Sequence, residues 1–112
     1  MEHVLSITQL NEYVRKSLAS DPMLKGIRLR GEISNFKRHS TGHLYFTLKD
    51  DEARIACVMF RSAAAGLFVK PQEGMRVVAL GNVSLYAQTG QYQFYVDFMQ
   101  DEIGRASCRE RV

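Results

Sequence analysis

"ARIACVMFRSAAAGLFVKPQEGMRVVALGNVSLYA", residues 53–87, is the stretch that decides the fold. Residues 53–61 are largely apolar and residues 75–87 form a second, longer apolar run, so both favour strands. Between them, SAAAG at residues 62–66 is rich in alanine and ends in glycine, which predicts a short helix. PQEG at residues 71–74 has the composition of a turn. The stretch therefore predicts a strand, a short helix and another strand.

Two more strands are predicted before this stretch and one after it. GIRLRGEISNF (residues 26–36) and HLYFTLK (residues 43–49) alternate apolar residues with polar or charged ones, and so does YQFYVDFM (residues 92–99). An alternation with a period of two predicts strands that are buried on one side. We assign three aromatic residues of these strands to the core: Phe46, Phe94 and Phe98.

A helix is predicted near the N-terminus. Ser6 and Gln9 have the spacing of a capping box. Four apolar residues then recur on one helical face: Ile7, Leu10, Val14 and Leu18. SDP at residues 20–22 ends the pattern, because a residue before proline avoids the helical region. The predicted helix spans Ile7–Ala19.

This order of elements predicts a mostly β protein, a five-stranded OB-fold barrel with an N-terminal helix and a short helix between strands three and four. Gly31 and Gly81 lie inside long strands, where a small barrel must bend. An open meander with both helices on one face is the alternative. We favour the barrel because closure removes exposed strand edges.

The chain divides into three parts by these patterns: residues 1–24 are an N-terminal helical extension and residues 25–101 are the OB-fold domain. EIGRASCRERV, residues 102–112, lacks both periodicities and reads like the translation of a common sequencing-library adapter. We interpret it as a non-native tail, with a native linker as the alternative. The tail holds three of the 15 basic and two of the 12 acidic residues, so the net charge without it falls from +3 to +2. The native polypeptide is then expected to continue differently after residue 101.

Composition excludes several classes of protein. The chain is 46% hydrophobic and 24% charged, as globular proteins are. No apolar run approaches the roughly 20 residues needed to span a bilayer, so no membrane partner is expected. MEHVLSITQ at residues 1–9 does not have the pattern of a signal peptide, which makes the cytoplasm the expected location. Cys57 and Cys108 are too few for a disulfide framework, and without the tail Cys57 is a lone buried thiol.

No catalytic residues, metal site or cofactor site are predicted. Residues 50–52, DDE, are adjacent in a turn, where carboxylates more often cap the backbone than act as acid and base. His39 and His43 lie on a loop with no third ligand at a suggestive spacing, so hydrogen-bonded loop histidines are the favoured interpretation.

The loop NFKRHSTGH, residues 35–43, carries more polar and aromatic side chains than a chain reversal requires. An OB-fold binds its ligand over strands two and three and the loops beside them, and single-stranded nucleic acid needs cations for phosphates and rings for bases. We therefore predict nucleic-acid binding by residues 25–101, and Tyr86 and Tyr95 are further candidates for stacking beside the set below. The predicted binding residues are Arg28, Arg30, Phe36, Lys37, Arg38, His39, His43, Tyr45, Arg54 and Arg61. Each of them alone is equally compatible with a solvated strand face or with packing under the loop.

Residues 4–101 resemble the N-terminal region of the exodeoxyribonuclease VII large-subunit family. The resemblance rests on RGEISNFKRHSTGHLYFTLKDD (residues 30–51), with SITQLNEYVRKSL before it and VMFR and GMRVVALGNVSLYAQTGQYQFYV after it. One departure is Thr41, where serine is commoner in the family.

The resemblance implies an N-terminal OB-fold that binds single-stranded DNA for a cytoplasmic exonuclease. Enzymes of this family degrade linear single-stranded DNA from either end into oligonucleotides, and several small subunits bind each large one. Their nuclease residues lie in a central domain, and long helices beyond it bind the small subunits. Neither region is present here, so the resemblance places no catalytic residue on this chain. An OB-fold that binds RNA, as anticodon-binding domains do, and a barrel that binds another protein remain alternatives.

Overall fold

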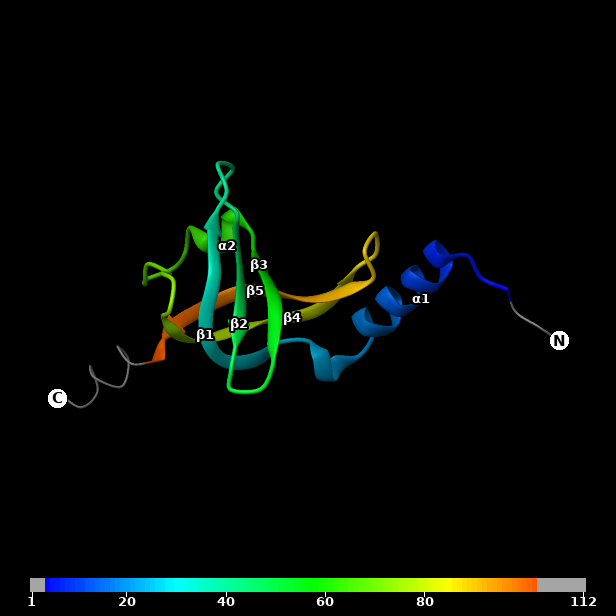
Figure 1. Ribbon diagram of the computed structural model, residues 1–112, viewed down its shortest axis with the longest axis horizontal. Coiled ribbons are helices and arrows are strands. Elements are labelled where there is room, and N and C mark those ends of the chain that lie inside the picture. The colour runs from blue at the N-terminus through cyan, green and yellow to red at the C-terminus, as the bar shows by residue number, and fades with distance from the viewer. Residues whose placement is uncertain (1–3, 103–112) are drawn as a thin grey trace.

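The computed structural model describes residues 4–102 as a small barrel with a helix at one end (Figure 1). The elements in chain order are α1 (Ile7–Ala19), the 3-10 turn η1 (Pro22–Leu24), β1 (Ile27–Arg38), β2 (Leu44–Lys49), β3 (Arg54–Met59), α2 (Arg61–Ala64), β4 (Arg76–Tyr86) and β5 (Gln91–Asp101). Every predicted helix and strand is confirmed, and α2 begins one residue earlier than the alanine-rich segment suggested. The predicted tail lies outside the described residues, apart from Glu102.

The five strands close into a barrel in the order β1-β2-β3-β5-β4. β3 and β5 pair in parallel, whereas all the other neighbours are antiparallel. The parallel pair is possible because α2 and the loop after it carry the chain across one end of the barrel before β4 (Figure 1). Closure confirms the OB-fold prediction and excludes the open meander.

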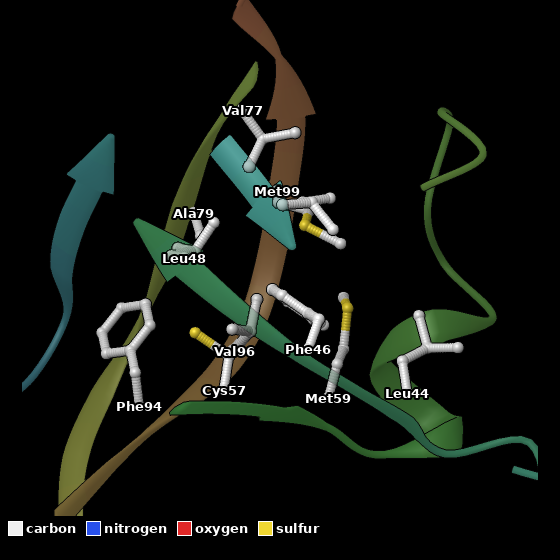
Figure 2. Packing of buried hydrophobic residues seen from close by; sticks show 11 residues of the cluster. Leu44, Phe46, Leu48, Cys57, Met59, Val77, Ala79, Phe94, Val96 and Met99 are labelled. Atoms are coloured by element: carbon white, nitrogen blue, oxygen red, sulfur yellow. The ribbon is translucent and has the colours of Figure 1, made fainter. Parts of the chain in front are cut away.

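Apolar side chains from all five strands fill the barrel (Figure 2). Phe46 and Phe94 are buried, as predicted, with exposed fractions of 4% and 0%. Cys57 is a free buried thiol, and burial raises its pKa to about 12, so it is inert as a nucleophile at neutral pH.

Phe98 is not a core residue, and that prediction is wrong. Leu80 of β4 pairs with Phe98 of β5, but the next residue, Gly81, pairs with Val96. Asp97 is therefore an extra residue in β5. Such a bulge reverses the alternation beyond it. Met99 consequently points into the core at 1% exposure, and Phe98 lies outside it.

Gly81 permits this bulge. A Cβ atom at Gly81 would collide with the carbonyl group of Tyr95 on β5, so no larger residue fits while the strands keep this approach. Gly31 is closely covered too, because a Cβ there would lie 3.1 Å from the carbonyl oxygen of Lys49. The predicted bends at both glycines are therefore explained by close backbone packing.

Helix α1 has the predicted bounds and the predicted capping box between Ser6 and Gln9. It lies beside the far end of the β4–β5 hairpin rather than over the barrel core (Figure 1). No residue of α1 is buried, and Ile7 and Leu10 on its apolar face are 74% and 46% exposed. Among the described residues, no helix is long and apolar enough to cross a membrane.

Candidate nucleic-acid interface

The outer face of β2 and β3 carries a row of paired side chains. Three residue pairs face outward because their neighbours on β2 point into the core: Tyr45 opposite Val58, Thr47 opposite Ala56, and Lys49 opposite Arg54. The row therefore runs from an aromatic end to a cationic end along the same two strands.

Two hollows follow one another along this row. The first, of about 350 Å³, is lined by Tyr45, Val58, Phe60, Tyr86, Gln93 and Tyr95. The second, of about 450 Å³, is lined by Thr47, Arg54, Ile55, Ala56, Gly90, Gln91 and Tyr92. Because they lie over successive pairs of β2 and β3, with β5 along one side, we describe them together as the groove.

Aromatic rings line the first half of the groove in edge-to-face contact. The ring of Phe60 lies 5.4 Å from that of His43 and 5.9 Å from that of Tyr95, between centroids. The ring of His39 lies 6.1 Å from that of Tyr45. These five residues form what we call the aromatic row, in which Tyr45 and Phe60 are 39% and 47% exposed. Rings left accessible in this way can accept stacked bases.

Two tyrosine hydroxyls are held in place at this end. The Tyr95 hydroxyl donates to Gln93 Oε1 at 3.0 Å, and the Tyr86 hydroxyl donates to Gln88 Oε1 at 2.8 Å. Burial, and then the neighbouring charge of Tyr86, raises the pKa of Tyr95 above its ordinary value. Tyr95 therefore stays a neutral ring, able to stack, throughout the physiological range.

Both histidines have structural hydrogen bonds within and beside the β1–β2 loop, residues 39–43. His39 Nδ1 is 3.0 Å from Thr41 Oγ1, and His43 Nδ1 accepts the backbone N–H of Arg61 at 2.9 Å. The second bond ties the loop to the residue after Phe60 and so fixes the aromatic row. The residues described include no cluster of three or more metal-ligating side chains around either histidine.

Four of the predicted cations border the groove or its loops. Lys37 pairs with Tyr45 across β1 and β2, and Arg54 lines the second hollow. The Arg61 side chain packs against Gly42 of the β1–β2 loop. Arg38 holds its guanidinium 5.8 Å from the ring centroid of Phe36 at the loop's entrance. These charges could neutralise phosphates while bases contact the rings.

Phe36 has a packing role as well as this cation contact. Its ring is half-buried and lies 6.3 Å from that of Phe46 in the core. The chain reaches this position through a bulge at Asn35, whose φ is 53°, and the Glu73 carboxylate accepts the backbone N–H groups of both Asn35 and Phe36. Phe36 therefore belongs beneath the loop rather than in the aromatic row.

Arg28 lies away from the groove, whereas Arg30 shares a hollow of about 190 Å³ with Arg54 and Tyr92, which line the second half of the groove. Arg28 lines a separate recess with Val78, Leu80, Phe98 and Gln100, over β1, β4 and β5. Arg30 forms an ion pair with Glu102 at 2.8 Å, beside a cleft that also contains Asp50, Asp51 and Glu52. Lys49 and Arg76 line the same cleft, so its charge is mixed, and Arg30 lies between this cleft and the groove.

Phe60 is one of two exposed aromatic groove residues that the sequence did not single out, the other being Tyr92 in the second hollow. Phe60 lies near the end of residues 53–61, which are apolar on both sides of the strand. Alternation therefore does not predict which side its ring faces. The signal that could have found it is its spacing: Ala56, Val58 and Phe60 are two residues apart and share one side of the strand. Tyr86 and Tyr95, rated below Tyr45 in the sequence, are equal members of the first hollow.

Comparison with known proteins agrees with the barrel fold. Residues 5–100 match the family described as "OB-fold nucleic acid binding domain". The chain is 48% identical over 99 residues to the exodeoxyribonuclease 7 large subunit of Clostridium tetani, covering 88% of this chain and 25% of that protein. It is 52% identical over 98 residues to the large subunit of the same name from Clostridium botulinum, covering 88% and 24%.

Among solved structures, the second OB-fold domain of replication protein A from Methanococcus maripaludis superimposes with a TM-score of 0.54 at 15% identity, covering 70% of this chain and 85% of that one. At this identity the likeness establishes the fold alone. The chain spans about a quarter of the length of the curated relatives it matches. It belongs to the family of OB-fold nucleic acid binding domains, in the form found in exodeoxyribonuclease 7 large subunits.

Proposed function

We propose that this domain binds single-stranded DNA in the groove over β2 and β3, without strong base preference. The observation that carries the proposal is the aromatic row, whose rings are partly exposed, with Lys37 beside Tyr45 and Arg54 farther along the same groove. Every base has a face that can stack on a ring, whereas phosphates need only nearby positive charge. A duplex hides its base faces, so the groove favours the single strand.

The DNA-binding residues that we propose are Tyr45, Phe60, Tyr86 and Tyr95 for stacking, with Lys37, Arg38, Arg54 and Arg61 for phosphates. His39 and His43 act mainly by holding the loop and Phe60 in place. Arg28 and Phe36 are left out because of the positions described above, whereas Arg30 remains a candidate for phosphate because it lines the hollow that adjoins Arg54.

For the full-length protein we propose the role that the names of its relatives suggest. It would be the large subunit of a cytoplasmic exodeoxyribonuclease that assembles with small subunits and degrades single-stranded DNA. The support is the identity of about half of the aligned residues to proteins of that name. Hydrolysis would be carried out by the part of these longer relatives that the present chain does not match.

Fluorescence anisotropy of a labelled 20-nucleotide strand, titrated at several salt concentrations, tests the DNA proposal. The same sequence is measured as duplex DNA and as RNA, with the whole chain and with a version that ends at Asp101. We expect the single DNA strand to bind best, with log K falling by about 0.7 per phosphate contacted as log salt rises. Better binding of RNA would favour the anticodon-domain alternative, and no binding at low salt would favour a protein partner.

Phe60→Ala and Phe68→Ala form a matched pair for the same assay. Both remove an exposed ring, but Phe68 is 93% exposed in the loop between α2 and β4 and lies against Phe98, away from the groove. Loss of one stacking platform costs about 1–3 kcal/mol. Phe60→Ala is therefore expected to weaken binding by about 5- to 150-fold, and Phe68→Ala by less than about twofold. Equal effects would contradict the placement of the groove.

A further inference from the structure

The β4–β5 loop, residues 87–90, forms one side of the groove's second hollow. Gly90 lines that hollow together with Gln91 and Tyr92 at the start of β5. The loop is closed by a hydrogen bond from the backbone N–H of Gly90 to the carbonyl oxygen of Tyr86, the last residue of β4, at 2.9 Å. Residues 88–90 are nevertheless exposed. The loop's other internal bonds, from Thr89 N–H to the Tyr86 carbonyl and from the Tyr86 hydroxyl to Gln88, also lie at the exposed end of the hairpin, so a contact from outside the loop would restrict it further.

Helix α1 supplies that contact through Asn11. Its Nδ2 donates to the carbonyl oxygen of Ala87 at 2.8 Å, across 76 residues of sequence. The same side-chain amide also covers Gly90, because a Cβ atom there would lie 3.4 Å from Nδ2 and 3.5 Å from Oδ1. Asn11 therefore touches both the first and the last residue of the loop.

Apart from the bond from Asn11, α1 packs along β4 through side chains that are only half-buried, Val14 and Leu18 among them. None of its residues is buried, so the helix is not held by an apolar core of its own. Its ends are completed locally, by the capping box at Ser6 and by backbone bonds from Ser20. Within residues 4–102, the hydrogen bond from Asn11 is thus the specific polar link between an independently capped helix and the groove wall.

We infer that α1 is part of the nucleic-acid site, and that Asn11 is a positioning residue that holds the β4–β5 loop in place before single-stranded DNA binds. The inference rests on the proposed function. A loop that is already ordered loses less conformational entropy when the ligand arrives, so the hydrogen bond contributes to affinity without touching the ligand. This role explains why a helix with an exposed apolar face lies at the tip of the hairpin.

Asn11→Ala is the test, with Ser17→Ala as the matched control at an exposed position of the same helix. Alanine is the better helix former, so neither variant melts α1, and circular dichroism verifies this. Amide hydrogen exchange of residues 87–91 is measured without DNA, and binding of the labelled single strand is measured over a range of salt. The first measurement tests the loop and the second tests its consequence.

We expect Asn11→Ala to accelerate exchange at Gly90 and to weaken DNA binding by about 2- to 12-fold, the equivalent of one hydrogen bond. The salt slope should stay that of the wild type, since Asn11 neutralises no phosphate. Ser17→Ala should change neither quantity.

Three results would overturn the inference. Unchanged exchange would show that Asn11 does not hold the loop, and faster exchange with unchanged affinity would show that the loop's order is irrelevant to binding. A salt slope reduced by about 0.7 would instead make Asn11 a neighbour of a bound phosphate. If the wild-type protein binds no single strand at all, the proposed function fails, while the exchange comparison still decides whether Asn11 anchors the loop.

Discussion

The barrel has two outer faces that carry similar side chains and differ in how these are arranged. The groove face combines Arg54 with Phe60, and the face over β1, β4 and β5 combines Arg28 with Phe98. On the groove face, rings contact one another in a row between two loops that are fixed by hydrogen bonds. On the other face, Phe98 contacts Phe68 of a neighbouring loop, and the recess beside Arg28 is only about 100 Å³.

The difference teaches that an arginine and a phenylalanine on one surface do not make a nucleic-acid site. A strand of DNA needs several rings in sequence, with charge alongside them and room for a nucleotide between the walls. The hollows of the groove, about 350 and 450 Å³, provide that room. Substitutions at the point where the two faces meet, of one cation on each face and of one ring test this difference.

Gly81→Ala is expected to have the largest effect, because Gly81 joins the two faces. It lies on β4 at the bulge, and its Cα hydrogen faces the carbonyl group of Tyr95 in the aromatic row. The added methyl group forces β5 away from β4 by displacing backbone rather than a flexible side chain. We expect the free energy of unfolding to fall by about 2–3 kcal/mol, measured by urea denaturation.

Gly66→Ala is the matched control for this substitution. Gly66 does not have a positive φ, and a Cβ atom there would lie 3.7 Å from its nearest neighbour, the carbonyl oxygen of Ala63. Stability should change by less than about 0.5 kcal/mol at such a site. A Gly81→Ala protein as stable as this control would mean that β4 and β5 can separate at the bulge, and that the two faces are not coupled there.

The bulge also marks the limit of what the sequence could predict. The elements follow from local signals: the capping box at Ser6 sets the start of α1, and alternation sets β2. Phe98 was misplaced because one extra residue, Asp97, reverses the inward side of β5, and a bulge depends on how β5 pairs with β4, which the sequence of β5 does not show. Gly81 predicted that a bend exists, but not which residue of β5 would become unpaired.

The candidate site was predictable in its location but only partly in its members. Lys37, Tyr45 and Arg54 follow from the β2–β3 face of the fold. Arg28 and Arg30 alternate just as regularly with apolar residues, and only the closed barrel shows that Arg28 faces a separate recess while Arg30 adjoins the groove. Asn11 gave no signal, because its partner Ala87 is brought to it by tertiary structure alone.

Arg54→Ala and Arg28→Ala compare one cation from each face. Arg54 borders the groove's second hollow, so its loss should remove one phosphate contact, lower the salt slope by about 0.7 and weaken single-strand binding by about fivefold. Arg28→Ala should leave the slope unchanged and weaken binding by less than twofold, as expected for a charge that acts only over a distance. Both are read from the anisotropy titration. A lower slope for Arg28→Ala would show that the strand wraps onto the second face.

The smallest expected effect concerns the ionisation of Tyr95. Burial first, and the nearby Tyr86 second, raise the pKa of its phenol above the ordinary value of 10.0. The folded protein then holds the proton more tightly than the unfolded chain, so the stabilisation is complete below pH 10 and is lost as the pH rises through the folded-state pKa. Titration of the Tyr95 ring-carbon resonance by NMR measures the shift directly.

Tyr86→Phe sharpens this measurement, because it removes the second cause and leaves the burial of Tyr95 in place. The pKa of Tyr95 should then move part of the way back toward 10.0 while staying above it. A full return would assign the shift to the charge of Tyr86, and the ring would be as well hydrated as one on an open strand face. A shift that persists makes Tyr95 a partly dry ring at the floor of the groove, which is the surface on which a base stacks with the least water to displace.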